Sequence, residues 1–361
     1  MKVNIGLAAT LAVLGLLVAC SNDKSKDAPK ASTTTTATTT ATTPDLGGHI
    51  LVSVTVDWEG AYLSEDGLDM LDALRRRLPE VPFTHFVSAG YFTTRSVATK
   101  TEPTSEPPAG ESLQPATELK AQVKPGDELA IHVHAWGSLV RAAKVPVHFA
   151  PSFLSGKAKL LEFDGGDVGF DSDLDNYSVQ ELRAIIATSR RLLTAAGLVP
   201  STSFRAGGYL GTPKVLEAAR AEGLDVDASA IDHKQLEGTE NAVHQARLKA
   251  VWPSVDSSTQ PYAIKTPSGD ILEVPIAAFM ENASVAEILD LLQRANARLA
   301  KAPDADVFVV LGFHQETAQE FGPMLLDAVE KMRADPTLKT KVRFVTVQSA
   351  AKAFRVRQAP H

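Results

Sequence analysis

The sequence predicts a single α/β domain, in which strands and helices alternate to build a parallel sheet or a barrel. Short runs rich in β-branched and aliphatic residues alternate with segments whose apolar residues recur at helical spacing, and such alternation is typical of a parallel sheet. The run VFVVLGF at residues 307–313 is continuously apolar, as expected of a strand buried on both faces. The chemically suggestive side chains lie at the C-terminal ends of predicted strands, which form the active-site face of an α/β barrel.

The predicted strands and helices follow one another along the chain. The strands are expected at residues 49–57, 84–88, 128–134, 203–205, 226–229, 271–275, 307–314 and 343–347. A first helix is expected where leucines recur at helical spacing, at Leu68, Leu71, Leu74 and Leu78. Later helices are expected to begin at Thr212-Pro213 and at three capping boxes, Ser178 with Glu181, Ser284 with Glu287, and Thr317 with Glu320. Residues 93–125 and 146–175 look like long loops.

The N-terminus has the pattern of an export signal. Lys2 precedes an apolar stretch at residues 5–18 that is too short for a stable membrane span. The stretch ends in LVAC, which resembles a bacterial lipobox. That resemblance implies a signal at residues 1–20, lipidation of Cys20, and an exported lipoprotein of the cell envelope. Ser21 after the cysteine resembles outer-membrane rather than inner-membrane sorting. The alternative is an ordinary signal peptide with an incidental cysteine.

Composition sets the remaining organisation. Residues 21–48 are rich in Thr, Ser and Lys and cannot bury apolar area, so we expect a disordered spacer. Residues 49–355 suit one domain, since α/β barrels typically have about 250 residues. Cys20 is the only cysteine, so the domain has no disulfide and depends on its core. The net charge of −7 gives no reason to expect nucleic acid as a partner.

Two pairs of side chains predict a metal site. His132 and His134 in GDELAIHVHAW are two residues apart on a predicted strand, so both imidazoles face the same side. Asp57 and Glu59 in ILVSVTVDWEG have the same spacing at the end of another strand. Two histidines and a carboxylate form an open ligand set for Zn²⁺, with room for water or substrate. Each pair alone could be a coincidence, but together they favour a site.

Four segments carry a resemblance to a known family: TVDWEG (55–60), HVHAW (132–136), FRAGGY (204–209) and LGFHQE (311–316). Their order and character resemble the NodB-like polysaccharide deacetylases, carbohydrate esterase family four, over residues 49–350. The resemblance implies a distorted (β/α)₇ barrel. It also implies an enzyme that removes acetyl groups from N-acetylated sugars with one divalent metal, usually Zn²⁺.

The chain departs from the usual family motifs at two places. The first motif normally has two adjacent aspartates, but here Trp58 follows Asp57 and Glu59 comes next. The resemblance then implies that Asp57 is the catalytic base and Glu59 a metal ligand, and the reverse assignment stays open. The second motif normally has two histidines four residues apart. Trp136 occupies the second position, so His134 is the expected substitute beside His132.

The other motifs imply further roles. Arg205 is expected to pair with the base, which would keep that carboxylate ionised and oriented. His314 is expected to be the general acid that protonates the leaving amine. Trp58 and Trp136 either form a sugar-stacking wall beside the metal or belong to the core, and Tyr209 is expected to contact the substrate.

Three functions remain open from the sequence. The first is a metal-dependent deacetylase of an envelope or exported polysaccharide. The second is a glycan-binding lipoprotein that has lost turnover, which the departures at Trp58 and Trp136 favour. The third is a metallohydrolase of another amide or ester, because a fold does not dictate the substrate.

Overall fold

The computed structural model describes residues 48–60, 63–93, 113–148, 151–154, 169–237 and 242–358. The predicted signal, Cys20 and all but the last residue of the predicted spacer lie outside these ranges. The described residues belong to one unit. Within them, no helix is both long enough and apolar enough to span a bilayer.

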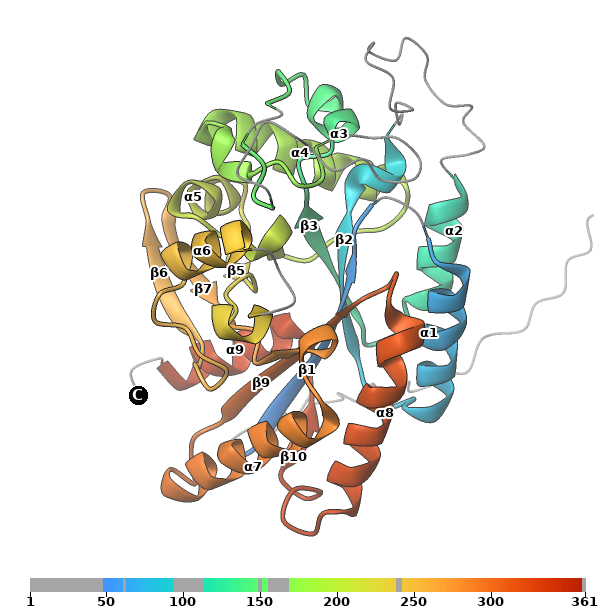
Figure 1. Cartoon of the computed structure of the whole chain (residues 1–361), viewed down its shortest axis with the longest axis vertical. Coiled ribbons are helices and arrows are strands. Elements are labelled where there is room, and N and C mark those ends of the chain that lie inside the picture. Colours follow the sequence, from blue (N-terminus) through green and yellow to red (C-terminus); the bar gives the residue numbers. More distant parts are fainter. Residues whose placement is uncertain are drawn as a thin grey trace, which may run out of the picture. The chain divides into compact units, whose positions relative to one another are not determined.

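A ten-stranded sheet forms the centre of the described part of the chain (Figure 1). Its order is β6-β7-β5-β4-β3-β2-β1-β9-β8, and β10 adds to β1. All pairs are parallel except β6 with β7. The strands are β1 (Ile50–Trp58), β2 (Phe83–Ser88), β3 (Glu128–Val133), β4 (Ser203–Ala206), β5 (Val226–Asp227), β6 (Tyr262–Thr266), β7 (Gly269–Glu273), β8 (Ala278–Phe279), β9 (Val307–His314) and β10 (Val342–Phe344).

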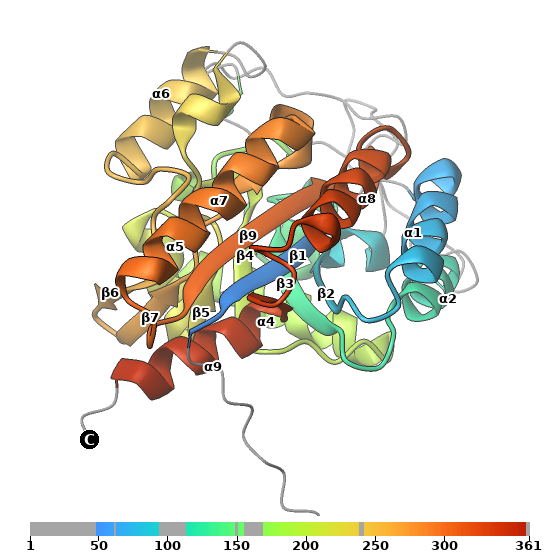
Figure 2. The ribbon, with the colours of Figure 1, turned by 90° about the horizontal axis from the view of Figure 1, so that it is seen from below.

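Helices cover this sheet and confirm the predicted distorted α/β barrel. Helices α7 and α8 pack against β9, α4 against β3, and α9 against β1 (Figure 2). The helices of the described residues are α1 (Glu65–Arg77), α2 (Leu113–Gln122), α3 (Gly137–Ala142), α4 (Val179–Ala195), α5 (Pro213–Ala221), α6 (Ala242–Val251), α7 (Val285–Lys301), α8 (Ala318–Ala334) and α9 (Val347–Gln358).

Local capping explains where several helices begin. Ser178 and Ser284 each form the predicted capping box at the start of α4 and α7. The Thr212 side chain caps α5, and Pro213 occupies its first turn. The box predicted at Thr317 is wrong, because that hydroxyl makes no cap bond and donates instead to the Glu281 carboxylate at 2.5 Å.

Some elements differ from the sequence prediction. Part of the expected loop at residues 93–125 forms α2, whose LQPATELKAQ sequence has only a weak apolar stripe. Helix α6 and the strands β6 and β8 were also not predicted. Strand β8 has only two residues, which is too short for a pattern to show.

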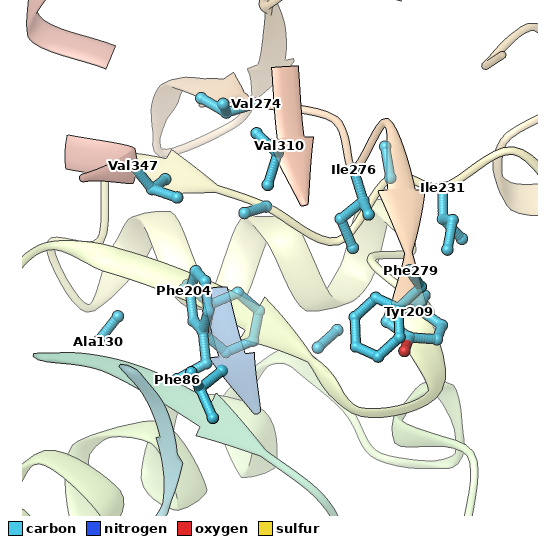
Figure 3. Packing of buried hydrophobic residues seen from close by; sticks show 14 of the residues in the cluster. Phe86, Ala130, Phe204, Tyr209, Ile231, Val274, Ile276, Phe279, Val310 and Val347 are labelled. Carbon is cyan, nitrogen blue, oxygen red and sulfur yellow. The ribbon is translucent and has the colours of Figure 1, made fainter. Parts of the chain in front are cut away.

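The core lies along the two central strands. Every residue of β1 is buried, as are the first seven of β9, because helices cover one face and the barrel interior covers the other. Aromatic side chains fill the interior, with Phe86 and Phe204 close to β1 (Figure 3). This packing fixes the strand ends, which is where the functional side chains lie.

Candidate metal and catalytic site

The sheet brings the six predicted site residues to one edge. The register pairs Asp57 of β1 with His314 of β9, and His132 of β3 with Arg205 of β4. Because the strands are parallel, their carboxyl ends meet at the same face. Glu59 and His134 follow directly after β1 and β3. A cavity of about 400 Å³ opens there, and its lining includes Asp57, Glu59, His132, His134 and His314.

Glu59 lies against two histidines in a metal-ligand arrangement. Its Oε1 is 3.4 Å from the Nε2 of His132, and its Oε2 is 2.6 Å from the Nε2 of His134. The ligand atoms of the three residues lie within 4.8 Å of one another. Burial disfavours the charged carboxylate, but His134 and then His132 outweigh this and hold the pKa of Glu59 well below its usual value.

Backbone carbonyls fix the orientation of both imidazoles. The Nδ1 of His132 lies 3.0 Å from the Arg205 carbonyl oxygen, and the Nδ1 of His134 lies 3.0 Å from that of Phe170. A carbonyl oxygen only accepts, so each Nδ1 carries the hydrogen. Each Nε2 is thereby turned towards Glu59, the direction from which a neutral imidazole binds a cation. The Phe170 ring also stacks on His134, with ring centroids 4.1 Å apart.

The donor set fits a divalent cation. The Oδ2 of Asp57 is buried and makes no hydrogen bond within the described residues. An unpaired buried polar atom is costly, and a cation would satisfy it. The Oε2 of Glu59 and the Nε2 of His132 contact other members of the trio, as the ligands of one cation would. A second trio, Asp57 with Glu59 and His314, also has ligand atoms within 4.8 Å, so the reverse assignment of Asp57 and Glu59 stays open.

Arg205 fixes the orientation of Asp57. Its Nη1 donates to Asp57 Oδ1 at 2.5 Å and to the Thr55 hydroxyl at 3.1 Å, and its Nε donates to the Ala228 carbonyl at 2.8 Å. The guanidinium carbon lies 4.0 Å from the centre of the Phe86 ring. Arg205 is completely buried, so this charge has Asp57 as its direct counterion and keeps the carboxylate in one orientation.

Glu281 supports His314, and no motif in the sequence predicts this role. It lies in the turn η5 (Met280–Asn282), and its Oε1 is 3.0 Å from His314 Nδ1 and accepts the His314 backbone N–H at 2.9 Å. Burial opposes the charged imidazole, but Glu281 outweighs this and raises the pKa of His314 to about 10. The opposite nitrogen, Nε2, lies 3.3 Å from Glu59 Oε1 and so faces the site.

The two tryptophans belong to the core. Trp58 lies between Asp57 and Glu59, so strand alternation turns it to the opposite face, where its indole N–H donates to His85 Nδ1 at 3.1 Å. The indole N–H of Trp136 donates to the Glu59 carbonyl at 2.8 Å. Both are buried and neither lines the cavity. Of the two alternatives from the sequence, the structure supports the core for both.

Tyr209 lines the cavity, and its contact with a substrate stays a prediction. Its ring packs edge-on against Phe279, with centroids 5.4 Å apart (Figure 3). Burial and the nearby charge of Asp57 raise the pKa of its hydroxyl well above the usual value, so it stays a hydrogen-bond donor. The remaining described lining residues are mostly apolar: Phe153, Leu154, Phe170, Gly208, Leu236, His244, Phe279, Glu281 and Asn282.

A larger hollow of about 860 Å³ lies elsewhere, beside Glu128, Val199 and Gln348. It contains none of the six predicted side chains and neither of the two metal-ligand trios. The predicted catalytic and metal-ligand side chains therefore place the candidate site in the smaller cavity.

Comparison with known proteins gives the fold. No model of a known protein family matches the sequence. No curated protein matches it either. A solved protein from Mycobacterium smegmatis, assigned as a polysaccharide deacetylase, is similar at 14% identity with a TM-score of 0.51, over 87% of this chain and 93% of that one. The Puue allantoinase is similar at 13% identity with a TM-score of 0.50, over 88% and 94%. The chain has the fold of the NodB-like polysaccharide deacetylases.

Proposed function

We propose that this protein is a metal-dependent hydrolase that removes acetyl groups from an N-acetylated polysaccharide of the cell envelope. The observation that carries the proposal is the arrangement around Glu59. Two imidazole Nε2 atoms, of His132 and His134, face this carboxylate. The pair Asp57–Arg205 and the pair His314–Glu281 flank it. Binding alone needs neither an oriented base nor an oriented acid.

The residues divide the chemistry between them. Glu59, His132 and His134 would hold the divalent cation, and two imidazoles with one carboxylate favour Zn²⁺. When bound, such a cation polarises the scissile carbonyl and acidifies water. Asp57 takes the proton from the attacking water through its unpaired Oδ2. Arg205 holds the Asp57 carboxylate in one orientation.

The leaving group needs a proton from the other side of the site. His314 carries one on Nε2, because Glu281 at Nδ1 favours the charged imidazole. As the carbon–nitrogen bond breaks, that proton passes to the departing amine. Asp57 and His314 are neighbours in register, so base and acid act on the same bound group.

The test combines an analysis of bound metal with an assay of acetate release. The purified chain is analysed for bound metal and then assayed for acetate released from acetylated glycans. We expect about one divalent ion per chain, and loss of acetate release on chelation or in His132→Ala. His233→Ala, at a histidine outside the cavity lining, is the matched control. Activity that survives both chelation and His132→Ala would reject the proposal.

A second candidate is hydrolysis of a different amide or ester. The similarity in fold to an allantoinase, a protein named for another substrate, favours keeping it. A panel of acetylated sugars, cyclic amides and simple esters separates the candidates. Glycan binding with neither metal nor acetate release would instead favour the non-catalytic binding protein, the third function that the sequence left open.

We also propose that the protein is an exported lipoprotein, anchored through Cys20 to the outer membrane. Two sequence features support this proposal: the LVAC motif and the serine at position 21. The anchor and the Thr-rich spacer would hold the enzyme near envelope polysaccharides.

A further inference from the structure

The turn that carries Tyr209 has an unusual backbone. Strand β4 runs directly into η3 (Gly207–Tyr209), where Gly208 has φ +60° and Tyr209 has φ +62°. Glycine adopts this left-handed conformation freely, but an aromatic residue does so rarely. Such a conformation persists only when the surrounding structure holds it, and it is found preferentially at functional sites.

Two buried side chains at α6 hold this turn. The Nε2 of His244 lies 2.8 Å from the Gly208 carbonyl oxygen, and the indole N–H of Trp252 donates to the Tyr209 carbonyl at 2.7 Å. Both acceptors are carbonyls, so both ring nitrogens must be donors. His244 and Trp252 are 2% and 4% exposed, so water does not compete for these bonds.

The same turn is also fixed on its other sides. The Ala206 backbone N–H donates to the Ser229 hydroxyl at 2.8 Å. The Phe153 ring lies so close to Gly208 that a Cβ there would come within 3.0 Å of it. The turn therefore has little freedom while α6 stays in place.

The turn places the Tyr209 side chain at the cavity. Within the described residues its hydroxyl makes no hydrogen bond, although the residue is only 8% exposed and lines the cavity with Asp57 and Glu59. The hydroxyl therefore offers a free donor at the cavity wall. A ligand acceptor in the cavity can accept that hydrogen bond.

We propose that His244 and Trp252 are positioning residues. They hold the strained turn so that the Tyr209 hydroxyl points at an oxygen of the bound substrate. The inference rests on the proposed function for its substrate. The proposal gives α6, which lies outside the four motif segments in the sequence, a part in determining activity.

A double-mutant cycle tests it. Trp252→Phe keeps an aromatic ring but removes the indole N–H donor, and Tyr209→Phe removes the hydroxyl. The probe is an N-acetylated chitin oligomer, or 4-nitrophenyl acetate if the oligomer is not cleaved. We expect each single variant to lower kcat/KM by about 10- to 100-fold, since a small misplacement has effects of this order. In the Tyr209→Phe background, Trp252→Phe should have little further effect.

Further variants separate positioning from general damage. His244→Leu should lower kcat/KM in the same way, and His244→Gln should restore part of it because its amide can donate. Lys249→Ala, at an exposed position of α6, is the control and should match the parent. If Trp252→Phe lowers kcat/KM equally in both Tyr209 backgrounds, the positioning role is overturned.

A readout without turnover distinguishes this inference from the proposed function. Amide hydrogen exchange in the peptide covering residues 203–212 should become faster in Trp252→Phe and His244→Leu, and remain unchanged in Lys249→Ala. Unchanged exchange in all three variants would overturn the proposal that His244 and Trp252 hold the turn. If the parent cleaves neither probe but exchange changes as expected, the proposed function fails, while the role of His244 and Trp252 in holding the turn stands.

Discussion

At the scale of single residues, the two groups proposed as base and acid each have a partner of opposite charge. Asp57 pairs with Arg205, which is completely buried, and His314 pairs with Glu281, whose side chain is 16% exposed. Arg205 fixes the orientation of Asp57, and Glu281 favours the charged imidazole of His314. The two pairs come from different strands and turns, so each can be tested by itself.

Glu281→Gln should lower kcat by about 10- to 100-fold with little change in KM, because His314 loses the charge that holds its proton. The amide oxygen can still accept from the His314 backbone N–H, so the turn should remain intact. Steady-state kinetics on an acetylated glycan checks this. Glu287→Gln, in the capping box of α7, is the control for a neighbouring glutamate. A parent-like kcat in Glu281→Gln would contradict the role of Glu281.

Gly207→Ala should lower the affinity for the metal by about 10- to 100-fold, because ligand orientation depends on such supporting contacts. A Cβ at Gly207 would lie 2.6 Å from His134 Nδ1 and 2.7 Å from the Val133 carbonyl oxygen, so the imidazole must move. Metal titration by calorimetry measures the change. Gly223→Ala strains the backbone at φ +80° without meeting any atom within 4 Å, and should keep parent affinity. Equal affinities in all three proteins would count against the ligand role of His134.

At the scale of elements, strand register decides which carboxyl groups meet. The strands β5 and β7 pair Asp227 with Glu273, and both side chains are completely buried. The Ser229 hydroxyl donates to Asp227 at 2.6 Å, and the Ala230 N–H donates to Glu273 at 3.0 Å. Burial raises the pKa of both carboxyls, and Asp227 raises that of Glu273 further, to well above its usual value.

This pair predicts a dependence of stability on pH. Because the pKa of Glu273 is higher in the folded state, its contribution to stability is complete below the unfolded pKa of about 4.5 and is lost as pH rises through the folded pKa. Glu273→Gln is neutral at every pH. The free energy of unfolding should therefore fall less between pH 5 and 8 than in the parent, as measured by urea denaturation. Glu237→Gln, at an exposed position, should keep the parent slope, and an unchanged slope in Glu273→Gln would sink this explanation.

At the scale of the whole molecule, the proposed lipid anchor has a consequence for where the protein is found. Cys20→Ala should leave the protein in the soluble fraction and not in the membrane, because the acyl chains proposed for Cys20 would supply the anchoring apolar area. Ser21→Asp should keep it membrane-bound but shift it towards the inner membrane. Cell fractionation followed by detection of the chain measures both. Membrane association that persists in Cys20→Ala would show a different anchor.

The sequence predicted what depends on local spacing. The strand alternation of His132 with His134, and of Asp57 with Glu59, places each pair on one side, and the structure brings both pairs to one cavity. Arg205 and His314 were found through motifs. The residues that support these side chains were not predicted, because their roles depend on tertiary contacts. Glu281, for example, lies 33 positions from His314 in the sequence. His244 and Trp252 lie on or next to a helix without a clear apolar stripe.

Main-chain oxygens hold both ligand imidazoles, at Arg205 and at Phe170. No point substitution can delete a carbonyl oxygen. Under the proposed function, substitutions at Leu154 and Leu236 in the cavity wall should therefore change which acyl groups fit, while His132 and His134 keep their orientation. Laboratory evolution of substrate range should accordingly find tolerant positions in those walls first.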